Sequence, residues 1–297
     1  MIYNIVFATD QNYIQHLDVA IRSLLENNKN SEFKIFIING GIESDEWKKL
    51  IKVSSQYNSE LINITIDDFL FEKLVTNHHF TKANYYRLFI PQFIEKGKVL
   101  YLDADIVVNG SIVDLFKTDI DKYYIAAVEN PGFNRHKELK MHANSQYFNS
   151  GVMLINIDKW KEFNLTQKVI DFVHNNPSSI KFVDQCGLNA VIDGRWKKLS
   201  LKFNQQAVIF EKGFEEKQEY FSEEELKQAK EKPIIVHYTG SSKPWQFRNK
   251  HPYKHLYWKY LRMTPFRRYI PKDLTILNLI KSLAPKRIKE FTKNVIK

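Results

Sequence analysis

Short apolar runs alternate with longer segments of helical pattern along the first hundred residues of the chain, and this alternation constrains the fold more than any other feature. Strand-like runs cover 3–9, 33–39, 60–66 and 99–102, and helical patterns cover 16–26, 44–57 and 83–94, the last with a break at Pro91. Strands separated by helices of about 10–15 residues are typical of βαβ units, whose parallel strands join one sheet. Shorter strand-like runs follow at 123–129, 150–157 and 233–239, with a helical pattern at 165–176. The sequence therefore predicts an α/β fold.

Length and composition indicate a globular protein that works in a reducing compartment. The chain has 297 residues, of which 43% are hydrophobic, so it can bury a substantial core. Its one cysteine, Cys186, has no partner for an internal disulfide, which favours a reducing environment. The first ten residues resemble no signal peptide, and no run approaches the roughly 20 apolar residues of a membrane span. We therefore expect a cytoplasmic location.

Positive charge is concentrated at the C-terminal end. Residues 243–297 contain 15 Lys and Arg against two acids, which gives this segment a charge of +13. Residues 1–242 carry a charge of −3, and the two parts together give the net charge of +10. Within this segment Ile276, Leu279, Ile280 and Leu283 form one helical stripe, and Pro285 can open a second helix that carries Ile288, Phe291 and Val295. Basic amphipathic helices settle on anionic membrane surfaces. The segment thus predicts membrane-surface association, with packing on the body and nucleic-acid binding as the alternatives.

Two acidic residues directly follow the strand at 99–102. Asp103 and Asp105 are separated only by Ala104, and the first strand ends on the similar sequence Ala8-Thr9-Asp10. Ligands of open α/β sheets bind outside the carboxyl ends of the strands. Carboxylates suit magnesium or manganese, which commonly complete their coordination with substrate phosphates. A divalent metal with a diphosphate would therefore offset the electrostatic cost of this acid pair.

Six motifs in order resemble those of family 8 of the retaining, nucleotide-sugar-dependent glycosyltransferases. They are FATDQNY at 7–13, YYRL at 85–88, YLDADIVV at 101–108, FNSGVMLIN at 148–156, DQCGLN at 184–189 and VHYTGSSKPW at 236–245. The resemblance implies a glycosyltransferase-A type, Rossmann-like catalytic domain over 1–245 that binds the nucleotide sugar, with a mixed, mostly parallel sheet. Residues 246–297 would then be a basic helical appendage.

The resemblance also assigns the nucleotide and metal contacts. Residues implied to contact the uridine are Ala8, Thr9, Asp10, Asn12 and Tyr13, with Tyr13 stacking on the base. The implied metal ligands are Asp103, Asp105 and His237, and Ala104 is small enough to let the ribose lie close. Gly240 and Lys243 would contact the diphosphate, and Arg87 would reach the donor sugar or its phosphate. Because His237 supplies an imidazole, manganese is expected ahead of magnesium.

A further group of residues is implied to hold and activate the donor sugar. It comprises Glu129, Asn149, Ser150, Gly151, Asp184 and Gln185, of which Asp184 and Gln185 are the expected catalytic residues. Glu129 stands where the family commonly has Asp, so the resemblance does not fix the sugar. Asp184 is also a candidate cap of a helix. Acceptor contacts are expected around Asn77, His78 and His79 and at the start of the C-terminal segment.

The expected reaction is the manganese-dependent, retaining transfer of galactose or glucose from a UDP-sugar. The acceptor would be a cell-envelope glycan, either lipooligosaccharide or another lipid- or protein-linked saccharide, at the cytoplasmic face of the membrane. Retention can proceed through a covalent glycosyl-enzyme formed on a carboxylate, or through same-face attack with Gln185 beneath the anomeric carbon. We favour same-face attack. A UDP-sugar hydrolase and a nucleotidyltransferase with the same metal site are the remaining alternatives.

Overall fold

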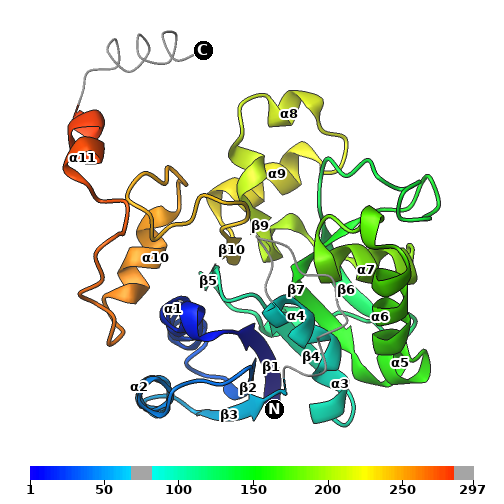
Figure 1. Ribbon diagram of the computed structural model, residues 1–297, viewed down its shortest axis with the longest axis horizontal. Helices are drawn as coiled ribbons and strands as arrows, with labels where there is room; N and C mark the ends of the chain where they lie inside the picture. Colours follow the sequence, from blue (N-terminus) through cyan, green and yellow to red (C-terminus); the bar gives the residue numbers. More distant parts are fainter. Residues whose placement is uncertain (68–81, 284–297) are drawn as a thin grey trace.

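The computed structural model describes residues 1–67 and 82–283 and confirms the predicted α/β fold (Figure 1). A seven-stranded sheet has the order β3-β2-β1-β4-β7-β6-β8. Its strands are β1 (Ile2–Thr9), β2 (Glu32–Asn39), β3 (Ser59–Thr65), β4 (Lys98–Leu102), β6 (Ile125–Glu129), β7 (Phe148–Asn156) and β8 (Lys197–Lys198). β3, β2, β1 and β4 run parallel, β7 is antiparallel to both β4 and β6, and β8 pairs parallel with β6. The sheet is therefore mixed and mostly parallel, as predicted.

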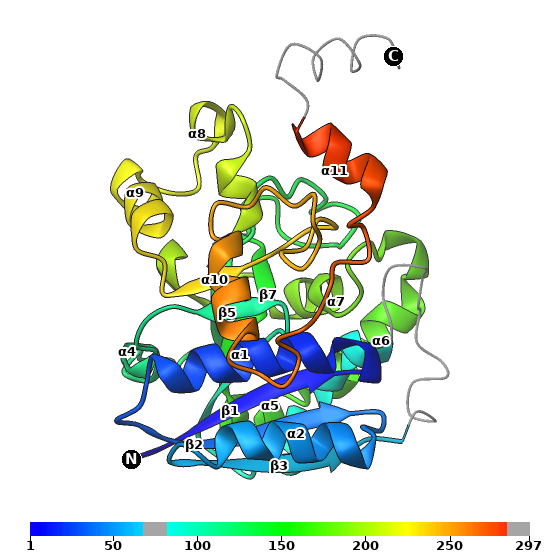
Figure 2. The same ribbon diagram turned by 90° about the vertical axis from the view of Figure 1, so that its left-hand side faces the viewer.

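Side chains of β1 alternate between two hydrophobic layers, one on each face of the sheet. Ile5 and Phe7 join the layer formed with α1 (Ile14–Glu26) and α2 (Ser44–Ser54), and Figure 2 looks onto this face. Val6 points into the opposite layer, which another set of helices covers. Those helices are α3 (Ile90–Phe93), α5 (Ile157–Glu162), α6 (Leu165–Asn175) and α7 (Val183–Ile192). Because both faces are covered, the strand ends remain as the place for a site.

The helix predicted over 83–94 is divided into two shorter helices of different type. The segment expected to be helical over 83–94 is a 3-10 helix, η3 (Lys82–Phe89), followed by the short α3. Pro91 lies in the first turn of α3, where its missing N–H costs nothing, so the helix restarts at this point. The shorter elements are η1 (Gln11–Tyr13), α4 (Val113–Phe116), η4 (Pro177–Ser179), η5 (Leu201–Phe203), η6 (Ala207–Phe210), α8 (Phe214–Lys217) and α9 (Glu223–Glu231).

A second, three-stranded sheet of order β5-β10-β9 lies beside the carboxyl end of β4. Its strands are β5 (Ile106–Val108), β9 (Gln205–Gln206) and β10 (Ile235–His237), so β10 is shorter than the strand predicted over 233–239. β10 runs antiparallel to β5, which pairs His237 with Ile106. This pairing brings the end of β10 next to the turn that joins β4 to β5.

The C-terminal segment packs on the body in its first part and exposes apolar side chains in its second. α10 (Lys254–Leu261) lies against α1, and Tyr257 and Tyr260 are buried there (Figure 2). α11 (Ile276–Leu283) confirms the helix predicted from the stripe of apolar residues, and Ile276 and Leu283 are 80% and 77% exposed. The second predicted helix, after Pro285, lies outside the described residues. Among the described helices, none is both long enough and apolar enough to cross a bilayer.

Candidate active site

The turn between β4 and β5 carries the two aspartates that the sequence singled out. After Leu102 the chain leaves the large sheet, and the backbone N–H of Asp103 donates to Gly151 O at 2.8 Å. The chain enters the second sheet at Ile106. This change of sheet lets both carboxylates turn toward one point, which a regular strand end would not guarantee.

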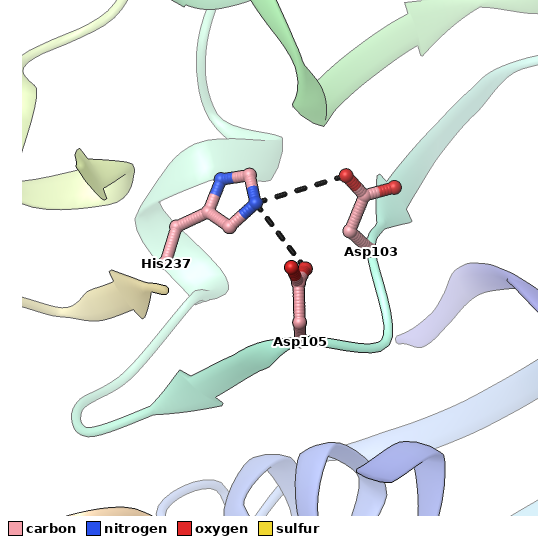
Figure 3. Close-up of side chains that lie close together, drawn as sticks. All are labelled: Asp103, Asp105 and His237. Carbon is pink, nitrogen blue, oxygen red and sulfur yellow. Dashed lines mark ion pairs between the residues drawn. The ribbon is translucent and has the colours of Figure 1, made fainter. Parts of the chain in front are cut away.

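His237, the last residue of β10, completes a cluster of three potential ligands (Figure 3). Its Nε2 atom lies 3.3 Å from Asp105 Oδ1 and 3.7 Å from Asp103 Oδ2. Each of the three residues offers one ligand atom, and these atoms all lie within 4.8 Å of one another. The imidazole is almost fully buried, whereas the two carboxylates are partly exposed. The structure thus brings the three predicted metal ligands together.

Arg87 neutralises two acidic residues at once. Its guanidinium lies 3.0 Å from Asp103 Oδ1 and 3.1 Å from Asp184 Oδ2, and it donates to Ser150 O at 2.8 Å. Tyr101 adds a hydroxyl that donates to Asp103 Oδ1 at 2.7 Å, while its ring lies under the guanidinium. The side chain of Arg87 is only 4% exposed. The sequence assigned Arg87 to the donor, and the contacts described here are those of a buried counter-ion that orients Asp103.

Lys243 performs the corresponding task for Asp105. Its ammonium donates to Asp105 Oδ2 and to Tyr238 O. Burial alone would raise the pKa of Asp105, but Lys243 and His237 outweigh it and hold the pKa well below its usual range. Both carboxylates of the pair therefore have cationic partners, which offsets the cost of their placement at a buried strand end.

The residues predicted to hold the donor sugar line one side of this cluster. Ser150 Oγ donates to Asp184 Oδ2 at 3.1 Å, and Ser150 N donates to Gln185 Oε1 at 3.0 Å. Gln185 Nε2 in turn donates to the hydroxyl of Tyr147 at 3.3 Å. Burial raises the pKa of Asp184 to about 6, against the opposing charge of Arg87. The contacts with Ser150 N and Tyr147 hold the side-chain amide of Gln185 in one orientation.

Asp184 is not the N-terminal cap of helix α7. Asp184 was a candidate helix cap, and that interpretation is wrong: α7 begins at Val183, its cap position is Phe182, and Asp184 lies within the first turn. A carboxylate there still interacts favourably with the positive end of the helix.

Glu129 has partners that no sequence motif indicated. Its Oε2 atom accepts from Lys198 Nζ at 2.8 Å and from Gln146 Nε2 at 3.1 Å, and its backbone carbonyl accepts from Gln206. The side chain is 5% exposed. Glu129 is thus fixed in place at the end of β6, next to β7, which carries Ser150.

The residues predicted to contact the uridine lie at the end of β1. Thr9 donates to Asp10 O, and the Asp10 carboxylate accepts from Asn12 N at 2.9 Å as the cap of η1. Tyr13 is 36% exposed, and its partial burial, together with the charges of Asp105, Asp10 and Asp103, raises its pKa to about 12. The phenol therefore stays protonated and presents a ring beside the acid cluster.

Trp245, the last residue of the motif at 236–245, had no predicted role, and the structure places its ring near Tyr13. Its ring stacks on His16 at a centroid distance of 3.5 Å and meets Tyr13 edge-on at 5.9 Å.

Gly240, in the same segment, has a φ of +84°, and a Cβ atom added there would meet no heavy atom of the described residues within 4 Å. Glycine is therefore required at this position by backbone conformation rather than by space.

The predicted acceptor residues Asn77, His78 and His79 lie outside the described part of the chain.

Comparisons with known proteins agree with this geometry. The model of glycosyl transferase family 8 matches residues 4–249. General stress protein A of Bacillus subtilis (strain 168) is 35% identical over 89% of this chain and 94% of that protein. The lipopolysaccharide 1,2-glucosyltransferase of Escherichia coli is 29% identical over 82% of this chain and 73% of that protein.

The fold has a close counterpart among solved structures. The crystal structure of the galactosyltransferase LgtC, in complex with donor and acceptor sugar analogues, superposes with a TM-score of 0.78 at 22% identity. The match covers 91% of this chain and 98% of that chain, which confirms the expected glycosyltransferase-A type fold. Together with the family model, these findings confirm the predicted resemblance: the chain belongs to glycosyltransferase family 8.

Proposed function

We propose that this glycosyltransferase moves galactose or glucose from a UDP-sugar to a saccharide acceptor, with retention of configuration at the anomeric carbon and in the presence of manganese. The observation that carries the proposal is the convergence of Asp103, Asp105 and His237 beside the end of β1. Two relatives whose names specify a sugar, a glucosyltransferase and a galactosyltransferase, support these two hexoses.

The residues present fit a divalent metal ion. Two carboxylate oxygens and one imidazole nitrogen form a donor set that suits manganese, and the imidazole disfavours magnesium relative to manganese. A metal ion bound there would neutralise charge on the leaving diphosphate. Lys243 lies at the same cluster and can transfer its hydrogen bond from Asp105 to a phosphate oxygen.

The acidic side chains among the residues predicted to hold the sugar already have partners, which supports same-face attack over a covalent intermediate. Asp184 is bound by Arg87 and Ser150, and Glu129 is bound by Lys198 and Gln146. A nucleophilic carboxylate would lose these stabilising contacts as it attacked. Gln185, whose amide is fixed by Ser150 N and Tyr147, would instead lie beneath the anomeric carbon and stabilise its positive charge.

The direct test is a donor screen with UDP-, GDP- and ADP-sugars, read first by donor hydrolysis and then by transfer to saccharide acceptors. We expect turnover only with UDP-galactose or UDP-glucose, only with an added divalent metal, and with retention of configuration in the product. Turnover of a GDP- or ADP-sugar at the same rate would contradict the proposed donor, and full activity in chelator would contradict the proposed metal.

We further propose that the enzyme acts on a cell-envelope glycan at the cytoplasmic face of a membrane, held there by residues 246–297. The exposed apolar side chains of α11 and the positive charge of this segment support that placement. A cavity of about 370 Å³ between α1, α2 and the residues after α10 adds support, because its walls include Arg22, Lys52, Arg262 and Arg267. These elements share the face seen in Figure 2, so a phosphate headgroup could enter the cavity while α11 lies on the bilayer.

A further inference from the structure

We infer that Asn204 and Asn149 are positioning residues that keep the proton of His237 on Nδ1, so that Nε2 is always the nitrogen available to the metal ion. The inference rests on the proposed metal site and adds two residues to it. Asn204 belongs to none of the six sequence motifs, and Asn149 was expected to contact the donor sugar.

The three side chains form one buried chain of hydrogen bonds that ends on the backbone. His237 Nδ1 lies 2.9 Å from Asn204 Oδ1, and Asn204 Nδ2 lies 2.9 Å from Asn149 Oδ1. Asn149 Oδ1 also accepts from the backbone N–H of Gly151 at 3.0 Å. Asn204 is fully buried, and His237 and Asn149 are 4% and 8% exposed. Water therefore has little access to these side chains and cannot easily replace their hydrogen-bond partners.

The backbone end of the chain fixes the direction of every bond in it. The N–H of Gly151 can only donate, so the atom of Asn149 that faces it must be the amide oxygen. That oxygen also faces Asn204, which must therefore present its NH₂ group, and its own oxygen is left to face His237. An oxygen that can only accept requires the proton to be on Nδ1.

The position of this proton determines what the Nε2 atom of His237 presents to the two aspartates. In the neutral ring, with its only proton on Nδ1, the lone pair of Nε2 points toward Asp103 Oδ2 and Asp105 Oδ1, at 3.7 and 3.3 Å. Three electron-rich atoms then converge on one position, which is the arrangement that a cation requires. The other tautomer would place an N–H in that position. Removing the partner that orients a histidine ligand typically costs about 10–100-fold in metal affinity.

Two substitutions at one position separate hydrogen bonding from packing. Asn204→Leu keeps the branched shape of the side chain but removes the acceptor, whereas Asn204→Asp keeps an oxygen that accepts from Nδ1 and gives up only the NH₂ group that donates to Asn149. A matched control is Asn28→Leu, because Asn28 is also a buried Asn with main-chain partners, Leu24 O and Ile112 N, and it lies away from the cluster. Manganese affinity of the full chain is measured by electron paramagnetic resonance without donor.

We expect Asn204→Leu to weaken manganese binding about 10–100-fold, Asn204→Asp to weaken it less because the acceptor for Nδ1 is kept, and Asn28→Leu to leave the affinity unchanged. Wild-type affinity in Asn204→Leu would overturn the inference, and so would equal losses in the Leu and Asp variants.

A second readout reports the tautomer without any metal. The ¹⁵N NMR shifts of the His237 ring, assigned by difference with His237→Ala and recorded at alkaline pH in chelator, distinguish the two tautomers. We expect the Nδ1–H form in the wild type and a gain of the Nε2–H form in Asn204→Leu. An Nε2–H form in the wild type would overturn the inference. If manganese does not bind the wild type at all, the proposed metal site fails, and the NMR result still decides the tautomer separately.

Discussion

Lys243 donates a hydrogen bond to the carboxylate of Asp105 across 138 residues of sequence. Arg87 makes the equivalent contact with Asp103. The ammonium of Lys243 thus stabilises the same negative charge that a metal ion and a diphosphate would share in the loaded enzyme. Under the proposed function, Lys243 has two alternative partners, Asp105 and a phosphate of the donor, and it cannot hold both with full strength.

Substituting Lys243→Met should separate these two partners. Without donor, manganese should bind as well as in the wild type or several-fold more tightly, because the competing ammonium is gone. The KM for the UDP-sugar should rise about tenfold or more, because a charge-assisted phosphate contact is lost. The metal-free protein should lose about 3 kcal/mol of stability, since a buried carboxylate is left with one cationic partner fewer. Calorimetric titration with manganese and steady-state kinetics measure the two effects, and weaker manganese binding in the variant would refute the competition.

Gly151→Ala should damage the metal site more than it damages the fold. A Cβ atom at this position would lie 2.3 Å from His237 Cε1 and 2.6 Å from Asp103 Oδ2, so at least one ligand must move. Gly187→Ala is the matched control, because its Cβ would meet Val169 and Val173 at 2.8 Å, away from the ligands. Manganese affinity should fall about tenfold or more in the first variant and stay near wild type in the second. Equal affinities in both variants would contradict the tight fit between β7 and the ligands.

Asp18, in the middle of α1, predicts a pH dependence of stability. Its carboxylate is fully buried and has no hydrogen-bond partner among the described residues, and burial raises its pKa to about 8. An acid whose pKa is raised in the folded state binds its proton more tightly there, so stability is highest below the unfolded pKa. The free energy of unfolding should fall as the pH rises from about 4 to 8, at ~1.4 kcal/mol for each pKa unit of difference.

Asp18→Asn should remove this dependence, because the amide cannot ionise. Urea denaturation of both proteins at several pH values measures it, and the two curves should diverge as the pH rises, with the variant more stable at pH 8. Parallel curves for the two proteins would show that Asp18 does not titrate in this range.

Most strands of the large sheet were predictable from the sequence, but the small sheet as a unit was not. Strands β1 to β4 are local apolar runs separated by helices, and local patterns suffice to recognise them. β5 carries the same kind of apolar residues as β4, so only its pairing with the distant β10 assigns it to another sheet. β9 consists of Gln205 and Gln206 and has no apolar pattern at all.

The same distinction applies to the site. Asp103, Asp105 and His237 were found because each belongs to a motif with fixed spacing. Asn204 and Lys198 were missed because each acts through a single contact made by tertiary packing, and a lone Asn or Lys carries no pattern. The counter-ion role of Arg87 was missed for a related reason: its partners lie in β4, β7 and α7, whose proximity the sequence does not state.

Truncation after Asp273 should remove membrane binding and leave the fold intact. Asp273 must be kept, because its carboxylate accepts from the backbone N–H groups of Phe247 and Arg248. The full chain should float with anionic liposomes at low salt and much less at high salt, because surface charges are screened over about 10 Å at 0.1 M. The truncated chain should float poorly, while its activity on a soluble acceptor stays within a few-fold. Equal flotation of both proteins would contradict a role for the segment after Asp273.

The central claim is that Asp103, Asp105 and His237 hold a metal ion through which the nucleotide binds. Calorimetric titration of UDP into the full chain, with manganese and with chelator, tests it most directly. We predict tight binding with manganese, much weaker binding in chelator, and no response to manganese in Asp105→Asn. His237→Ala should weaken the manganese-dependent binding about 10–100-fold. If UDP binds equally well with manganese and with chelator, or if Asp105→Asn keeps the full response to manganese, the proposed metal site is wrong.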